Sequence, residues 1–424
     1  MNQRPKKVWI IVAYYPPDGG AGTPIYCAIA ESLAAENFDI SVITSFPHYK
    51  KTRPLLEKGK WFSREEKSGV HVFRGIVYAG DVSNIGKRFI NYLSMDFSAT
   101  ITTFRLPKPD LVLITTPLMM IGFSALLAKL CRGVPFLYNV QDLYPDAVVQ
   151  AGAVKQGWVS RLLAMQERWA YKYSSHIVTI SEGQKEALVK RGVSGGKITI
   201  IPNFVDTSFI SPIGKETTVR GNLNLNDKTV VSYFGNLGLA QSVETILLAA
   251  KILQKHPHIH FVIVGDGVKR ESLREMRITH ALDNVTIMDY PPREKTSEWL
   301  ATADISLVSL KRGVSTFAPP SKTWSIMASG RPLIATVEEE SDLGKIIQRT
   351  GAGLVVPPEN PNALADAIVQ LAASPEMREK MGKAGRSYVE TYLNQPKVMS
   401  QWIELIQETI ALCAKGNSNR SRSV

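Results

Sequence analysis

Lys322 is the residue of this sequence whose type and position most suggest chemistry. It stands in the segment Pro320-Ser321-Lys322-Thr323, at the start of an expected helix that closes at Gly330. The first turn of a helix carries partial positive charge, so a lysine there needs an anionic partner. A diphosphate would be such a partner, and an ammonium beside it would stabilise the charge that builds on a departing phosphate. A solvated lysine without a ligand is the alternative.

Glycine-rich turns that lead from a strand into a helix occur in both halves of the chain. The first contains Gly19 and Gly20, and the second contains Gly235, Asn236 and Gly238. Free backbone N–H groups and the dipole of the following helix attract phosphate at such turns. A tight strand-to-helix connection without a ligand also explains each of them. A third turn, Val264–Gly267, is interpreted as structural.

Asp142 follows the expected strand 136–140, in the segment Gln141-Asp142-Leu143-Tyr144-Pro145-Asp146. Ligands of parallel sheets bind at the carboxyl ends of the strands, so Asp142 is a candidate contact for an acceptor or a transferring sugar. A helix cap or turn former explains an aspartate here equally well. Asp146 is interpreted as structural only.

Several functional classes are disfavoured by what the chain lacks. The second expected strand ends in Thr44-Ser45, without the acidic residue that a dinucleotide-binding oxidoreductase needs for the ribose. The run His256-Pro257-His258-Ile259-His260 has no acidic or cysteine cluster to complete a metal site. The three cysteines have neither disulfide-like nor zinc-like spacing, which favours a reducing cytosol: Cys27, Cys131 and Cys413.

The elements that must position these residues alternate between strand-like and helical patterns. We expect strands at 8–13, 39–44, 111–114, 136–140 and 176–180 in the first half, and at 229–234, 260–264, 285–288, 305–309, 333–335 and 353–356 in the second. Such alternation predicts an α/β fold with two doubly wound parallel sheets. The expected boundaries are a first domain at 1–207, a second at 208–395, a helix at 396–414 that crosses back to the first, and a disordered basic tail at 415–424.

The charge of the chain points to an anionic partner for its first half. Residues 1–206 hold 25 Lys and Arg against 16 Asp and Glu, whereas the whole chain has a net charge of +12. No nucleic-acid motif accompanies this charge, so a membrane surface or a diphosphate-linked acceptor fits better. The apolar stretch 111–131 is interrupted at Thr115-Thr116-Pro117, which argues against a membrane span. Residues 85–93 fit an interfacial helix or a packed core helix about equally.

Taken together, these motifs and their order resemble glycosyltransferase family 4. The resemblance rests on the Gly19-Gly20 loop, Ile201-Pro202-Asn203, Gly235–Gly238, Val264–Gly267 and the segment Pro320–Pro332. Within the family, the segments around Asp142 and Lys322 are similar to those of colanic acid biosynthesis transferases of the WcaI type and of related amino-fucosyl transferases. The resemblance implies the GT-B architecture of two Rossmann-like domains facing a cleft, with C-terminal helices packing back on the first domain. It also implies a retaining mechanism without a metal or other cofactor.

Carried over by position, the resemblance assigns roles to particular residues. Asp142 and Lys322 would be catalytic, and Lys322 would also bind the donor, together with Gly19, Gly20, Gly235, Asn236, Gly238, Ser321, Ser325 and Glu340. Many members carry an arginine and a lysine where this chain has Asn236 and Gln241, so phosphate binding must depend on other residues, of which Lys322 is the natural one. The family's pair of glutamates would fall on Phe317 and Ser325, and Glu338–Glu340 could replace it in part.

The expected activity is a retaining hexosyltransferase in surface polysaccharide synthesis. Its donor would be a nucleotide-sugar, GDP-fucose or a UDP-sugar, and its acceptor a polyprenyl-diphosphate-linked or other saccharide. The expected location is cytoplasmic, with peripheral contact to the inner face of the plasma membrane and no nucleic acid partner. A GT-B sugar-nucleotide epimerase and a non-catalytic nucleotide-sugar-binding scaffold are the alternatives.

Overall fold

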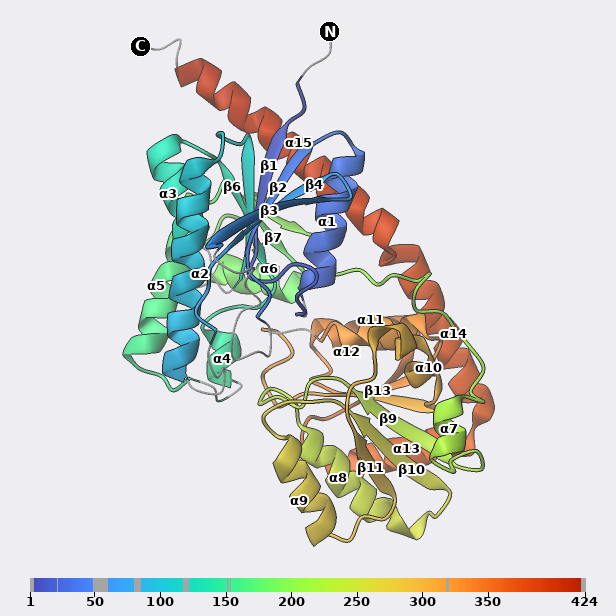
Figure 1. The fold of residues 1–424 in the computed structure, drawn as a ribbon. Helices are drawn as coiled ribbons and strands as arrows, with labels where there is room; N and C mark the ends of the chain where they lie inside the picture. Colours follow the sequence, from blue (N-terminus) through green and yellow to red (C-terminus); the bar gives the residue numbers. More distant parts are fainter. Residues whose placement is uncertain are drawn as a thin grey trace. The chain divides into compact units, whose positions relative to one another are not determined.

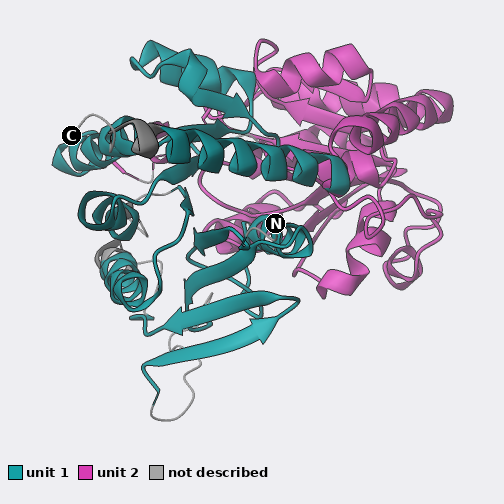
Figure 2. Cartoon of the chain, turned by 90° about the horizontal axis from the view of Figure 1, so that it is seen from above, with its two compact units in different colours: residues 1–145, 156–202, 396–424 teal, residues 146–155, 203–395 magenta. Residues whose placement is uncertain are grey.

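The computed structural model describes residues 4–20, 22–48, 60–79, 85–116, 122–150, 152, 154–317 and 320–420. The chain divides into two compact units, coloured separately in Figure 2. Unit 1 contains residues 1–145, 156–202 and 396–424, and unit 2 contains residues 146–155 and 203–395. The chain passes from unit 1 to unit 2 after Pro202, five residues before the expected domain boundary at 207.

Unit 1 is built on an eight-stranded sheet (Figure 1) in the order β3-β4-β2-β1-β5-β6-β7-β8. Every pair is parallel except β3 with β4. The strands are β1 Lys7–Ile11, β2 Asp39–Ser45, β3 Phe62–Lys67, β4 Val70–Gly75, β5 Leu111–Thr115, β6 Phe136–Val140, β7 His176–Thr179 and β8 Ile198–Ile200. The five strands predicted in this half are confirmed. The central ones, β5 and β6, are buried along their whole length, as strands covered on both faces must be.

Unit 2 holds a six-stranded, fully parallel sheet in the order β11-β10-β9-β12-β13-β14. All six predicted strands are present: β9 Thr229–Phe234, β10 Ile259–Val264, β11 Val285–Met288, β12 Ile305–Ser309, β13 Leu333–Thr336 and β14 Gly353–Val356. The order reverses direction at β9, next to β12, so the glycine turn after β9 opens at the switch point of the sheet, where ligands of open α/β sheets bind.

Helices cover both sheets, as the alternating pattern predicted. Those of unit 1 are α1 Thr23–Ala35, α2 Ile85–Arg105, α3 Gly122–Arg132, α5 Trp158–Tyr173 and α6 Glu182–Lys190, with α15 Gln395–Arg420 at the end of the chain. The others are α4 Asp146–Gln150, α7 Thr218–Asn222, α8 Val243–Ile252, α9 Arg270–Thr279, α10 Thr296–Ala301, α11 Lys322–Ala328, α12 Asp342–Thr350, α13 Pro361–Ala373 and α14 Pro375–Tyr392. Short 3-10 turns lie at Gly195–Lys197, Leu253–Lys255 and Arg293–Lys295. No helix within the described ranges is both long and apolar enough to cross a bilayer.

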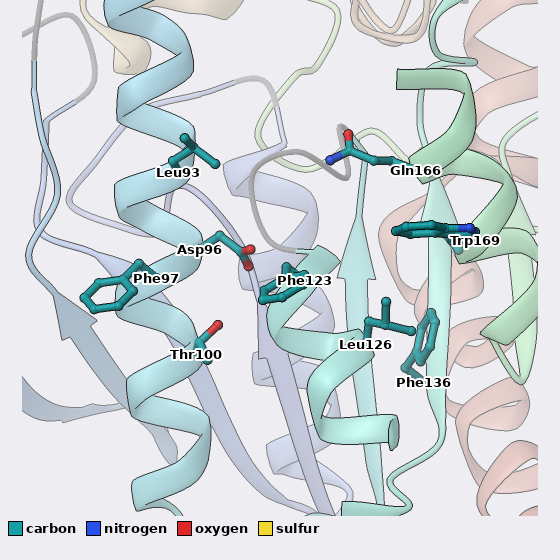
Figure 3. A pocket seen from close by; sticks show the side chains of 10 residues that line it. Leu93, Asp96, Phe97, Thr100, Phe123, Leu126, Phe136, Gln166 and Trp169 are labelled. Atoms are coloured by element: carbon teal, nitrogen blue, oxygen red, sulfur yellow. The ribbon is translucent and has the colours of Figure 1, made fainter. Parts of the chain in front are cut away.

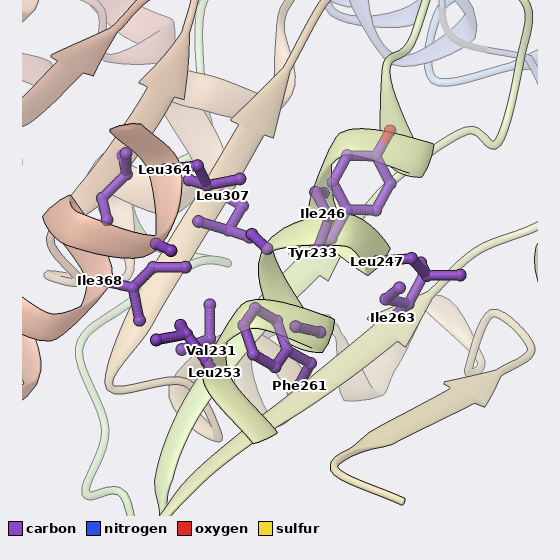
Figure 4. Packing of buried hydrophobic residues seen from close by; sticks show 14 of the residues in the cluster. Val231, Tyr233, Ile246, Leu247, Leu253, Phe261, Ile263, Leu307, Leu364 and Ile368 are labelled. Carbon is purple, nitrogen blue, oxygen red and sulfur yellow. The ribbon is translucent and has the colours of Figure 1, made fainter. Parts of the chain in front are cut away.

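The core of unit 2 forms where α8 and α13 pack on one face of the sheet (Figure 4). Tyr233 and Phe261 from the sheet, Ile246 from α8 and Leu364 from α13 are all fully buried there. Tyr233 belongs to this core through its ring, while its hydroxyl reaches the end of the strand. The packing therefore fixes the position of a polar group at the carboxyl edge of the sheet.

One expectation about the C-terminus is wrong in part. We expected residues 415–424 to lack regular structure, but α15 continues through Arg420. No proline interrupts this stretch, and the single Gly416 costs a helix only about 1 kcal/mol. Residues 421–424 lie outside the described ranges. The described part of this helix from Pro396 onward belongs to unit 1.

Candidate functional site

The side chain of Lys322 is directed at the glycine turn after β9. Its Nζ lies 2.7 Å from Oη of Tyr233 and 3.1 Å from Oε1 of Gln241. The same Nζ lies 3.9 Å from the centroid of the Tyr233 ring. Tyr233 in turn donates to the Asn236 carbonyl oxygen at 2.7 Å. Lys322 thus lies beside the glycine turn that contains Asn236, and its role as a diphosphate ligand stays a prediction.

This amine has only neutral partners in the described structure. Tyr233 and Gln241 supply oxygen atoms without negative charge, and burial lowers the pKa of Lys322 to about 7. An amine of this kind gains its full charge only when an anion is close to it. A diphosphate at the glycine turn would supply that charge, and its binding would raise the pKa of Lys322.

The glycines of this region allow two loops to pack closely. The Gly235 N–H donates to the Val264 carbonyl at 3.0 Å, and the Leu237 N–H donates to the Asp266 carbonyl at 2.9 Å. A Cβ on Gly265 would lie 2.0 Å from the Gly235 carbonyl oxygen, so no larger residue fits there. The turn Val264–Gly267 therefore supports the glycine turn after β9, in agreement with the structural interpretation of its sequence.

Gly235→Ala is expected to weaken nucleotide-sugar binding about tenfold, an affinity loss of about 1.4 kcal/mol. A Cβ at position 235 would lie 2.8 Å from Nζ of Lys322, so it would displace the amine from the turn. Titration calorimetry with the donor nucleotide measures the loss. Gly221→Ala is the matched control, because a Cβ there meets nothing within 4 Å. Equal affinity of the Gly235→Ala variant and the wild type would contradict this role of Lys322.

The other residues predicted to bind the nucleotide-sugar differ in their burial and in their hydrogen bonds. Asn236 and Ser321 are exposed, while Ser325 is half-buried one turn into α11. Glu340 is exposed, whereas Glu338 accepts hydrogen bonds from the Gly313 N–H and the Ser315 hydroxyl, each at 2.5 Å. These bonds lower the pKa of Glu338 despite its partial burial. Of the three consecutive glutamates, Glu338 is thus the one with a defined carboxylate position.

A second buried cation near the turn was missed by the sequence analysis. Lys269 Nζ donates to the Gln241 carbonyl at 2.8 Å and pairs with Glu244 at 2.7 Å. Lys269 comes two residues after Gly267, and no motif marks it. Its partner Glu244 already neutralises it, so Lys322 is the better phosphate ligand of the two.

Asp142 lies at the carboxyl edge of β6 in unit 1, as predicted. Its backbone N–H and that of Gln141 both donate to Oγ1 of Thr116, at 3.2 and 3.0 Å. No hydrogen-bond donor of the described residues faces its carboxylate, and burial raises the pKa of Asp142 to about 6. A half-buried carboxylate without a donor is costly to a folded chain, which favours a ligand contact over a capping role.

A buried polar cluster adjoins Asp142 and was not predicted. The Tyr26 hydroxyl donates to Thr115, and Asn139 Nδ2 donates to the same hydroxyl at 3.0 Å. Burial raises the pKa of the Tyr26 phenol, and the nearby charge of Asp142 adds to this rise. Tyr26 stands one turn into the helix that follows the first glycine loop, so its position in that helix is the signal that could have identified it.

Side chains of unit 1 make hydrogen bonds to the backbone at and around the first glycine loop. Oδ1 of Asp18 accepts from the Gly19 N–H at 3.2 Å, and Oδ2 accepts from the His48 N–H at 2.8 Å. Gly20 has a φ of +155°, and a Cβ there would approach the Tyr14 ring to 3.2 Å. The buried Arg74 donates to the Pro16 carbonyl at 2.5 Å. Helix α1 then begins without a side-chain cap.

The three histidines of the run His256–His260 were not expected to bind a metal, and the structure shows where their rings lie. His256 and His258 stack edge to face at 5.8 Å, while Nε2 of His260 lies 2.9 Å from Oγ1 of Thr286. Their rings thus do not converge on a common point. Within the described ranges, no three His, Cys, Asp or Glu side chains are grouped as metal ligands.

Comparison with protein families assigns both halves of the chain. Residues 19–203 match the glycosyl transferase 4-like domain, and residues 228–374 match the glycosyl transferases group 1. The two matches together span more than half of the 424 residues. They contain all the predicted site residues. The first match ends before the expected domain boundary at 207, and the second begins after it.

Similar sequences and solved structures agree with this assignment. The chain is 28% identical over 389 residues to the putative colanic acid biosynthesis glycosyl transferase WcaI of Escherichia coli, covering 89% of this chain and 94% of that one. It is 28% identical over 278 residues to the probable glycosyltransferase WbjE of Pseudomonas aeruginosa, covering 65% and 69%. Its fold is similar to that of sucrose-phosphate synthase from Thermosynechococcus elongatus, with a TM-score of 0.75, 21% identity and coverage of 96% and 100%. The Anabaena protein HepE, solved in complex with UDP-glucose, has a TM-score of 0.71 at 14% identity, with coverage of 95% and 99%.

Proposed function

Because this chain belongs to the glycosyltransferases of family 4 with the GT-B fold, we propose that it transfers a sugar from a nucleotide-sugar to a lipid-linked or saccharide acceptor in surface polysaccharide synthesis. The colanic acid assignment of its relative WcaI supports the pathway. GDP-fucose and UDP-sugars are the proposed donors, and the UDP-glucose complex of a protein with the same fold supports a nucleotide-sugar at this kind of site.

The observation that carries the proposal is the Lys322 amine at the glycine turn of unit 2. A cation with neutral neighbours, placed beside a glycine turn at the switch point of a parallel sheet, suits a diphosphate. As the glycosidic bond of the donor breaks, negative charge grows on the leaving diphosphate, and Lys322 stabilises it. The acceptor hydroxyl attacks the sugar from the same face, so the anomeric configuration is retained. No metal ion and no other cofactor takes part.

Asp142 is the proposed contact of unit 1 with the acceptor or the transferring sugar. Its carboxylate has no competing hydrogen-bond donor among the described residues, so it is available to a sugar hydroxyl. A hydrogen bond from a hydroxyl favours the charged form and would lower the raised pKa of Asp142. The enzyme is proposed to act in the cytoplasm, at the inner face of the plasma membrane.

The decisive experiment follows a radiolabelled sugar. The purified protein is first screened by thermal shift against GDP-, UDP-, dTDP- and ADP-sugars, because a ligand of the folded state raises the unfolding temperature. The stabilising donor is then supplied in labelled form with a membrane lipid extract. Transfer of label into the lipid fraction supports the proposal. Interconversion of the free donor would indicate an epimerase, and stabilisation without any turnover would indicate a binding scaffold.

A further inference from the structure

Unit 1 has an apolar hollow between helices α2, α3 and α5, drawn in Figure 3. Its volume is about 660 Å³, within the usual range of small-molecule sites. Each of the three helices contributes a wall, and β6 contributes to the base. The apolar lining includes Leu93, Phe97, Phe123, Leu126, Phe136 and Trp169.

The rim of this hollow exposes large side chains to water. Phe97 is 68% exposed, Phe123 is 58% exposed and Trp169 is 45% exposed, and they come from three different helices. Exposed apolar groups that gather on adjacent elements mark a binding surface, whereas single ones need no explanation. Ile90 and Leu93 of α2 are also about half exposed, so the interfacial interpretation of this helix fits better than a core interpretation.

Basic residues outnumber acidic ones on these three helices. Their sequences contain eight Lys and Arg residues and two acidic ones, Asp96 and Glu167. Both acids are buried: Asp96 accepts a hydrogen bond from the Ser124 N–H at 3.0 Å, and Glu167 accepts one from the Tyr138 hydroxyl at 2.7 Å. The lining of the hollow is thus mainly apolar, with Asp96, Thr100 and Gln166 as its polar members. The excess of basic residues on the three helices complements an anionic head group.

We propose that this hollow binds the hydrocarbon chain of a lipid phosphate, namely the lipid-linked acceptor of the transfer. The inference rests on the proposed function and specifies its acceptor. A chain can enter and fill an apolar cavity of this volume, whereas the flat surface of a bilayer contacts only the protruding side chains. The positive surroundings would hold the phosphate of such a lipid close to the rim.

Binding of alkyl phosphates of increasing chain length tests the proposal directly. Octyl, decyl and dodecyl phosphate are titrated into the full-length protein below their micelle concentrations. We expect the dissociation constant to fall about threefold to fourfold for each added methylene, as burial of hydrocarbon predicts. Excess inorganic phosphate should not abolish binding. An affinity that does not change with chain length would overturn the proposal.

Variants of the rim and of the cavity localise the site. Phe97→Ser and Phe123→Ser should each weaken dodecyl phosphate binding at least threefold without loss of folding, because both side chains are already exposed. Thr100→Phe should fill the hollow, so that decyl and dodecyl phosphate bind no more tightly than octyl phosphate. Ile278→Ser in unit 2, which removes a side chain that is 75% exposed, is the matched control and should leave binding unchanged. Unchanged binding in all three hollow variants would overturn the assignment.

A binding experiment with lipid vesicles distinguishes a site for one lipid chain from a site that contacts a membrane surface. If anionic phospholipid vesicles bind the protein through Phe97 and Phe123 while monomeric alkyl phosphates do not bind, the surface is a membrane contact and the chain site is refuted. The titrations need neither donor nor turnover. Chain binding without sugar transfer would count against the proposed function alone, and transfer to soluble acceptors without chain binding would count against this inference alone.

Discussion

Lys322→Met is expected to lower the rate of sugar transfer by about 100- to 1,000-fold, the range seen when one stabilising donor is removed from a developing oxyanion. The same change should stabilise the free protein by roughly 1 to 3 kcal/mol at pH 7 and below. Burial lowers the pKa of Lys322 to about 7, so the folded chain binds the proton of this amine more weakly than the unfolded chain does. The resulting loss of folding free energy is complete below pH 7 and disappears above the ordinary pKa of lysine. Steady-state kinetics and denaturant unfolding measure the two effects.

Two further measurements separate this role from a general effect of losing a lysine. Lys345→Met, on the exposed side of α12, is the control and should change neither activity nor stability. Calorimetry in buffers of different ionisation enthalpy should show proton uptake when a nucleoside diphosphate binds between pH 7 and 9, and Lys322→Met should abolish that uptake. Full activity in Lys322→Met would remove the amine from the mechanism.

Asp142→Asn should lower the transfer rate by about 100-fold, typical of a lost catalytic carboxylate contact. It should also stabilise the protein by about 1 to 3 kcal/mol at pH 7, since the raised pKa of about 6 means that the folded state disfavours the charge. The sign follows from the proton balance: between pH 4 and 6 the folded carboxyl holds a proton that the unfolded one has released. Stability from this group therefore falls as the pH rises through that window.

The pH dependence distinguishes a buried carboxylate from a surface one. The stabilisation of Asp142→Asn should disappear below pH 4, where both states are protonated, and chemical denaturation at pH 3.5 and pH 7 measures the difference. Asp366→Asn, on the exposed side of α13, is the control and should be neutral at both values. A stabilisation that is the same at both pH values would mean that the charge of Asp142 is not its cause.

Much of the fold follows from hydrophobic patterning alone. Eleven strands were predicted and all are present, because buried parallel strands are continuous apolar runs such as Leu111–Thr115 and Phe136–Val140. Three strands were not predicted. Strand β3 was missed because its residues Phe62–Lys67 are mostly charged and exposed at the sheet edge. Strand β4, Val70–Gly75, was missed although it lies inside the sheet, between β3 and β2, and is largely buried. Strand β8 is only three residues long, too short for a pattern to show. Edge strands depend on their neighbours for hydrogen bonds, and that information is not local.

Residues of the candidate site could be predicted only where their type is unusual for their place in the chain. Gly20, Gly235 and Lys322 were identified because glycine turns and a cation at a helix start are unusual in themselves. The partners Tyr233 and Gln241 were not, since a tyrosine in a strand looks like any other core residue. Glu340 was chosen over Glu338 from the same run of glutamates, and only the bonds of Glu338 to Gly313 and Ser315 separate them.

The amino-acid sequence by itself determined the two parallel-sheet domains, the glycine turns and the family, because those depend on periodicity and on residues that few others can replace. Only the tertiary structure decided that Lys322 meets neutral oxygen atoms, that no described residue donates to the carboxylate of Asp142, and that three helices line a mainly apolar hollow. Charge state and cavity shape arise from groups distant in the chain. Their energies depend on burial and separation in space, which no local pattern encodes.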